Sequence, residues 1–220
     1  MSFVAQSHHM DFRSASAHLE VIRTLMERTA LYRRALAPTT LAIGTLGLLA
    51  GFAGWWFQLE SPREFATSWM SVAAAAAGIA FVLMRREALH VREGFWSPPA
   101  RRVAQAVLPT FAAGFAAGLL AVIPAGSDPS LRVWLPPLWM VLYGAGLHAA
   151  GFFMPRGIRL FGWVFVMAGL LFAADAVLGH PATGGPDLVR AHLVMGGVFG
   201  GLHLLYGLYL LRTRGSVMTP

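Results

Sequence analysis

The feature that most constrains this chain is a series of six apolar stretches, each long enough to cross a lipid bilayer. They lie at about 38–58, 67–84, 103–124, 134–154, 158–178 and 191–211. A spanning α-helix needs roughly 20 mostly apolar residues, whereas a barrel strand needs about 10 residues of alternating polarity. Because a bilayer offers no water to bare peptide groups, the stretches predict an all-α, polytopic bundle of six transmembrane helices.

The composition agrees with a membrane protein and excludes several kinds of site. Of the 220 residues, 56% are hydrophobic and 12% charged, and the mean hydropathy is +0.59. The chain has no cysteine, which excludes disulfides, thiolate metal ligands and cysteine nucleophiles. The first 35 residues lack the uninterrupted apolar core of a secretory signal peptide, so we expect the mature chain to start at Met1.

The arginines predict how the helices are threaded through the membrane. Fourteen of them lie in segments on one side of the predicted spans and only three on the other. By the positive-inside rule, both termini face the cytoplasm, with short outer loops at about 59–66, 125–132 and 179–190. The net charge of +7 is therefore a topology signal, and we expect no nucleic-acid partner.

The spans form three hairpins that begin and end in the cytoplasm. We expect the chain to divide into a cytoplasmic segment 1–37, a six-helix transmembrane domain 38–212 and a short cytoplasmic tail 213–220. The sequences "PTTLAIGTLGLLA" from Pro38 and "PTFAAGFAAGLLA" from Pro109 are alike, and "WM" recurs at Trp69 and Trp139. Either the first two hairpins are a parallel duplication, or the small and leucine residues match by chance.

Small residues recur four positions apart, which lets helix backbones approach closely. Tight packing within one bundle explains them, and a homodimer face is the alternative. The pairs are Gly47 with Gly51, Ala73 with Ala77, Gly114 with Gly118, Gly196 with Gly200, and Gly197 with Gly201.

The cytoplasmic side carries two candidate contact regions. Residues 18–37 have apolar side chains at helical spacing and predict an amphipathic helix, which rests on lipid headgroups or docks a cytoplasmic protein. The link 85–102 contains Pro98 and Pro99, which predict an extended turn. Arginines in both regions anchor the topology or bind anionic lipid or a partner: Arg33, Arg34, Arg85, Arg86, Arg101 and Arg102.

Ionisable groups within a bilayer are costly and are therefore candidate functional residues. Asp175 near the outer end of the fifth span and His192 in the first turn of the sixth would lie at similar depth in antiparallel neighbours. We expect a hydrogen bond between them that fastens the third hairpin. Proton transfer or ligand binding, and snorkelling of both groups to the surface, are the alternatives.

His148 and His203 lie at comparable depth on the fourth and sixth spans. Two such histidines could hold a b-type haem. The simpler interpretation is that each bonds a carbonyl or a hydroxyl, with Tyr143 and Tyr206 as available partners. Metal-binding patterns such as HExxH, the P-loop, the nucleophile elbow and the dinucleotide fingerprint are all missing. We therefore expect no metal, no catalytic residue and no cofactor, with haem b as the exception to consider.

Two phrases carry a resemblance: "MERTALYRRALAPTTLAIGTLGLLAGF" from Met26 and "PLWMVLYGAGLHAAGFFMPRGIRLFGWVFVMAGLLF" from Pro137. In these the chain resembles a group of small, uncharacterised bacterial integral membrane proteins. The resemblance implies six spans and no assigned activity. Some of these proteins are encoded beside winged-helix regulators, so the resemblance also implies a cytoplasmic protein partner.

Three functions are compatible with these features. The first is a non-enzymatic membrane subunit or sensory protein that contacts a cytoplasmic partner. The second is a small permease or proton-coupled carrier that uses Asp175, His192 and His203 as relay groups. The third is a haem b or quinone redox subunit. No acidic residue lies at the centre of a span, which favours the first over the second.

Overall fold

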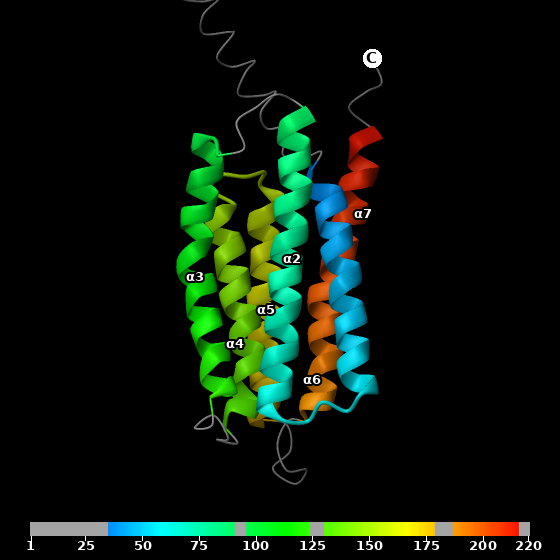
Figure 1. Ribbon diagram of the computed structural model, residues 1–220, viewed down its shortest axis with the longest axis vertical. Helices are drawn as coiled ribbons and strands as arrows, with labels where there is room; N and C mark the ends of the chain where they lie inside the picture. The colour runs from blue at the N-terminus through cyan, green and yellow to red at the C-terminus, as the bar shows by residue number, and fades with distance from the viewer. Residues whose placement is uncertain (1–34, 91–95, 124–129, 179–186, 216–220) are drawn as a thin grey trace, which may run out of the picture.

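The computed structural model describes residues 35–90, 96–123, 130–178 and 187–215. Within these ranges all regular secondary structure is helical, so the all-α prediction is confirmed. The helices lie side by side with their long axes nearly parallel (Figure 1). The predicted amphipathic helix at 18–37 falls almost entirely outside the described residues, as do Arg33 and Arg34.

The helical elements match the apolar stretches in order. They are Ala35–Trp56, α2 (Pro62–His90), α3 (Pro98–Val122), α4 (Ser130–Ala150), α5 (Gly157–Leu178), α6 (Leu188–Met195), the π-helical segment η3 (Gly196–Gly201) and α7 (Leu202–Gly215). The last three follow one another without a break and form one rod. Among the described residues, five helices are long and apolar enough to cross a membrane, and α4, with 21 residues, is not among them. Six spans arranged as three hairpins stay a prediction.

Local sequence explains where the helices begin. At α2, the Ser61 backbone N–H donates to Glu64 Oε2 and the Glu64 N–H donates to Ser61 Oγ, both at 3.1 Å, which is a capping box. The extended turn predicted at Pro98–Pro99 is wrong, because these prolines open α3 after an extended Ser97. Proline lacks an N–H and has a helix-compatible φ, so it is tolerated in the first turn.

Glycines bring the first and last rods into close contact. A Cβ added at Gly51 would lie 2.6 Å from the Cα of Gly196, and one added at Gly47 would lie 3.0 Å from the Cα of Gly200. No side chain larger than hydrogen fits between these backbones without a shift. The prediction of tight packing within the bundle is therefore confirmed for these two pairs.

Of the other small-residue pairs, Gly114 and Gly118 face α4, since a Cβ at Gly118 would lie 2.9 Å from the Trp139 ring, but two pairs lie on an open surface. A Cβ at Gly197 or Gly201 would meet nothing within 4 Å, and Ala73 and Ala77 are exposed on α2. Small residues at spacing four therefore mark a close helix contact at some positions and an open surface at others.

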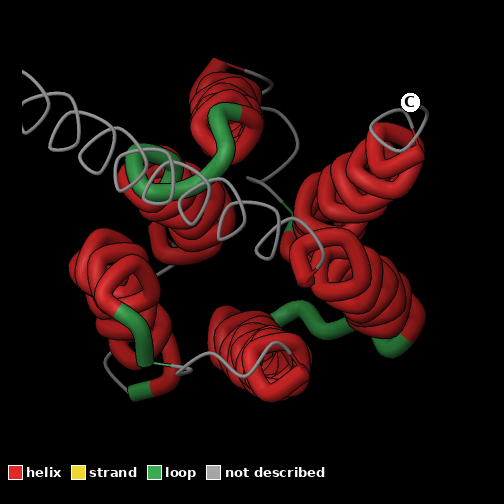
Figure 2. Tube along the Cα trace, turned by 90° about the horizontal axis from the view of Figure 1, so that it is seen from above, coloured by secondary structure: helices red, strands yellow, loops and turns green. Residues whose placement is uncertain are grey.

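Contacts between helices extend across the predicted hairpins. Helix α4 packs against α5 and α3, and α6 contacts α2 and α4. The α4–α5 contact is backbone to backbone, since a Cβ at Gly162 would lie 2.6 Å from the carbonyl oxygen of Gly144. Figure 2 shows the rods arranged around a common centre. The sixth rod thus meets helices from several parts of the chain.

Candidate functional site

A hydrogen-bonded pair of side chains links α4 to α7. His203 Nε2 lies 2.8 Å from the Tyr143 hydroxyl, and His203 Nδ1 lies 2.6 Å from the carbonyl oxygen of Phe199. A carbonyl oxygen only accepts, so Nδ1 carries the proton and donates. In the neutral imidazole Nε2 then accepts from Tyr143. The expectation that a buried histidine bonds a carbonyl and a hydroxyl is confirmed at His203.

Phe199 belongs to the π-helical segment η3, whose sequence is GGVFGG. The N–H of Leu202 points to the carbonyls of both Phe199 and Val198, and the His203 side chain adds a further donor to the Phe199 carbonyl. π-Helical turns inside α-helices occur frequently at functional sites. Here the hydrogen bond between His203 and the Phe199 carbonyl stabilises the irregular turn and holds the histidine side chain in place.

Aromatic rings surround this pair. The Tyr143 ring centroid lies 4.9 Å from that of Phe165 and 5.0 Å from that of Phe199. Phe161 lies edge-on to His203 at 5.1 Å and stacks on Tyr206 at 4.7 Å. These rings come from α4, α5, η3 and α7, so the hydrogen-bonded pair stands at the meeting point of several helices.

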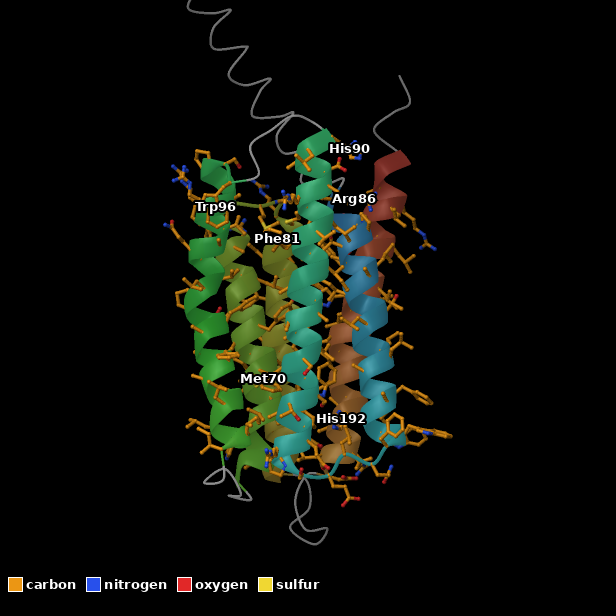
Figure 3. All side chains as sticks on the ribbon, viewed as in Figure 1. Met70, Phe81, Arg86, His90, Trp96 and His192 are labelled. Carbon is orange, nitrogen blue, oxygen red and sulfur yellow. The ribbon has the colours of Figure 1, made fainter. Side chains whose placement is uncertain are left out.

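A second buried histidine lies toward the other end of the bundle. Trp69 Nε1 on α2 donates to His192 Nδ1 on α6 at 3.0 Å. His192 is fully buried, with 0% of its surface exposed, and the Phe65 ring lies 4.7 Å from it. Figure 3 shows His192 near the end of the bundle opposite Arg86 and His90.

Glycine makes room for the His192 ring. A Cβ at Gly54 would collide with the imidazole Nδ1 and carbon atoms. The first helix therefore needs a residue without a side chain at position 54. Because Nδ1 accepts from Trp69, the ring proton of the neutral imidazole lies on Nε2. In the described part of the chain, no partner with good hydrogen-bond geometry meets that atom.

The predicted hydrogen bond between Asp175 and His192 is wrong. His192 instead bonds Trp69, and Asp175 is exposed on α5. The physical reason is the position of α6, because Gly196, the first residue of η3 directly after it, packs against Gly51 of the first helix. The His192 imidazole therefore points toward the first helix and α2, and the carboxylate on α5 has no part in this site.

His148 has ring contacts of its own. Its ring is edge-on to Phe152 at 5.4 Å and to Trp163 at 5.5 Å, and its Nδ1 is buried without a hydrogen-bond partner in the described residues. Both ring nitrogens of His203 are hydrogen-bonded. A haem iron at His203 would therefore have to replace the bond to Tyr143 or the bond to Phe199.

The sequence also missed two functional partners. Trp69 and Phe199 each bond a histidine, and neither was a candidate residue. For Trp69 a signal existed in the recurrent "WM", because both indoles donate hydrogen bonds inside the bundle: Trp69 to His192 and Trp139 to the carbonyl of Gly114 at 2.8 Å. Nothing in the sequence indicates which carbonyl His203 meets.

The charged candidates gather away from these buried sites. Arg85 and Arg86 are exposed at the end of α2, and Arg101 and Arg102 are exposed at the start of α3. In the described residues, no group of three or more histidine, aspartate or glutamate side chains is placed to hold a metal ion. Comparison of the chain with protein-family models, with curated proteins and with solved structures found no match.

Proposed function

We propose that the protein is a non-enzymatic integral membrane protein that acts as a membrane subunit or sensory protein and contacts a cytoplasmic partner. The observation that carries the proposal is the length of α2. Its 29 residues span about 43 Å at about 1.5 Å per residue, against a hydrocarbon core of about 30 Å. About two turns of the helix therefore extend past the hydrocarbon.

The projecting end of α2 has the composition of a contact surface. Leu89 is 66% exposed there, and Arg85 and Arg86, both exposed, outnumber the single acidic residue Glu87. An exposed apolar side chain among exposed positive charges is suited to a partner whose surface is acidic with an apolar centre. This end carries the arginine-rich links, so the positive-inside rule supports a cytoplasmic location.

The rest of the proposal concerns threading. We infer six spans, with α4 as the fourth, both termini in the cytoplasm and the three short links outside. The uneven distribution of arginines supports this orientation, and the resemblance to small bacterial membrane proteins supports the bacterial cytoplasmic membrane as the location. The 21 residues of α4 are sufficient, because a spanning helix needs only about 17–25.

The placement of the polar groups favours this function over a proton-coupled carrier. Proton relays inside membrane bundles are chains of Asp, Glu or His side chains, but Asp175, the acid that such a chain would use here, is on the exposed surface of α5. The buried threonines Thr39 and Thr40 donate to carbonyls of their own helix. His203 and Tyr143 are hydrogen-bonded to each other. None of these contacts specifically supports the hypothesis that the protein is a redox subunit.

The experiment is site-specific photo-crosslinking in cells, with a photoreactive amino acid at Leu89. The control position is Leu171 on α5, which is exposed to the same extent but lies within the membrane. A protein adduct at position 89 that is missing at 171, and that is lost on Arg85→Glu with Arg86→Glu, supports the proposal. Adducts with lipid alone at both positions contradict it.

A further inference from the structure

The turn between α4 and α5 holds an arginine in a fixed position. The guanidinium carbon of Arg159 lies 5.2 Å from the centroid of the Phe152 ring, which is a cation–π contact. A Cβ at Gly151 would collide with the backbone and side chain of Arg159, so the arginine stem packs directly on the turn. Arg159 is accordingly only half-buried rather than extended into solvent.

This arginine has no acidic neighbour on its own helices. The only acidic residue of α4 and α5 is Asp175, which lies about 24 Å farther along α5 at about 1.5 Å per residue. Arg156, in the turn itself, is exposed and adds a second positive charge. The amino-terminal end of α5 contributes a further partial positive charge. Within α4, α5 and the turn between them, Arg156 and Arg159 therefore have no acidic side chain close by.

The residues beside it indicate the depth of the site. Trp163 lies one helical turn after Arg159 and is 52% exposed, and its ring meets the edge of His148. Exposed tryptophans in membrane helices favour the level of the lipid headgroups, where the ring is in an apolar region and the N–H meets water. Arg159 thus lies at the level where phosphates of the bilayer are found.

We infer that the α4–α5 turn binds the headgroup of an anionic phospholipid. Arg159 and Arg156 bind the phosphate oxygens, for which a guanidinium provides two parallel donors. Phe152 and Trp163 lie against the first part of the acyl chains. The site requires only that the protein spans a membrane, so it holds whether or not α2 contacts a cytoplasmic partner.

The test measures the binding of lipid to the purified protein. Full-length protein in neutral detergent is titrated with phosphatidylglycerol or phosphatidylcholine, and bound lipid is counted by native mass spectrometry. We expect a preference for phosphatidylglycerol that falls about fivefold with Arg159→Gln. Arg212→Gln is the matched control, since Arg212 is exposed on α7 and its loss changes the net charge equally.

Three outcomes overturn the inference. An equal loss with Arg159→Gln and Arg212→Gln indicates a general effect of charge. Inorganic phosphate that displaces phosphatidylglycerol at comparable concentration indicates a site for the free anion. An unchanged preference for phosphatidylglycerol in the Arg159→Gln protein indicates that Arg159 does not bind the headgroup. Thermal unfolding of each variant in phosphatidylcholine separates loss of binding from loss of fold, and Arg159→Lys, which keeps the charge, should retain more of the preference than the glutamine.

Discussion

The hydroxyl of Tyr143 and the imidazole of His203 form a 2.8 Å hydrogen bond between residues 60 positions apart in the chain. The bond links α4 to α7, and the other ring nitrogen of His203 bonds the π-helical turn at Phe199. The buried side chain of His203 thus joins α4 to α7 and stabilises the π-helical turn that precedes α7. We interpret this pair as a lock on the bundle.

Replacing Tyr143 by phenylalanine tests the lock. The substitution keeps the ring but leaves Nε2 of His203 as a buried acceptor without a donor, so we expect a loss of about 1 kcal/mol in the free energy of unfolding. The measurement is unfolding of the purified protein in detergent. Tyr209→Phe is the matched control, because Tyr209 is 58% exposed. Equal losses in both variants would argue against a special role of the Tyr143 hydroxyl.

Alanine at two adjacent glycines should have opposite effects. A Cβ at Gly196 would lie 2.8 Å from the Cα of Gly51, whereas one at Gly197 would meet nothing within 4 Å. We expect Gly196→Ala to destabilise the protein by about 1–3 kcal/mol through overpacking. Gly197→Ala should be neutral or stabilising by up to about 1 kcal/mol, because alanine favours the helix. The measurement is thermal unfolding of both variants, and similar melting temperatures would be incompatible with the close contact of the two rods.

A double-mutant cycle tests the bond between Trp69 and His192. Trp69→Phe removes the indole N–H, and we expect it to cost about 1 kcal/mol or more with His192 present and less in a His192→Phe background. Additive losses would show that the two side chains do not interact.

Asp175→Asn should change stability by less than about 0.5 kcal/mol, as is usual for an exposed surface substitution. Asp175 is exposed and has no part in the His192 contact, so thermal unfolding of this variant should match that of the unaltered protein. A large destabilisation would restore the pairing of Asp175 with His192 that the sequence predicts.

The sequence predicts the helices well because hydropathy and length are local properties. It also predicts that a buried histidine bonds a carbonyl or a hydroxyl, because few other states are tolerable for a buried imidazole; His203 bonds one of each. The Asp175–His192 pair failed because hydropathy does not specify which helices are neighbours. That choice depends on Gly51 and Gly196, whose contact turns α6 toward the first helix.

The π-helical turn could not be predicted either. Four of the six residues of η3 are glycine, so its side chains provide little periodicity from which to read a conformation. The Phe199 carbonyl of this turn is hydrogen-bonded by His203, four residues farther along, and the orientation of His203 depends in turn on Tyr143 of α4, 60 positions away in the chain.

In the proposed function, the arginine-bearing end of α2 projects into the cytoplasm. The chain has no cysteine of its own, so Leu89→Cys and Glu60→Cys each give a single reactive thiol at opposite ends of α2. The most direct measurement is labelling with a membrane-impermeant maleimide, before and after the cells are opened. We predict that Glu60→Cys reacts in intact cells and Leu89→Cys only after opening. Labelling of Leu89→Cys from outside intact cells would contradict the account.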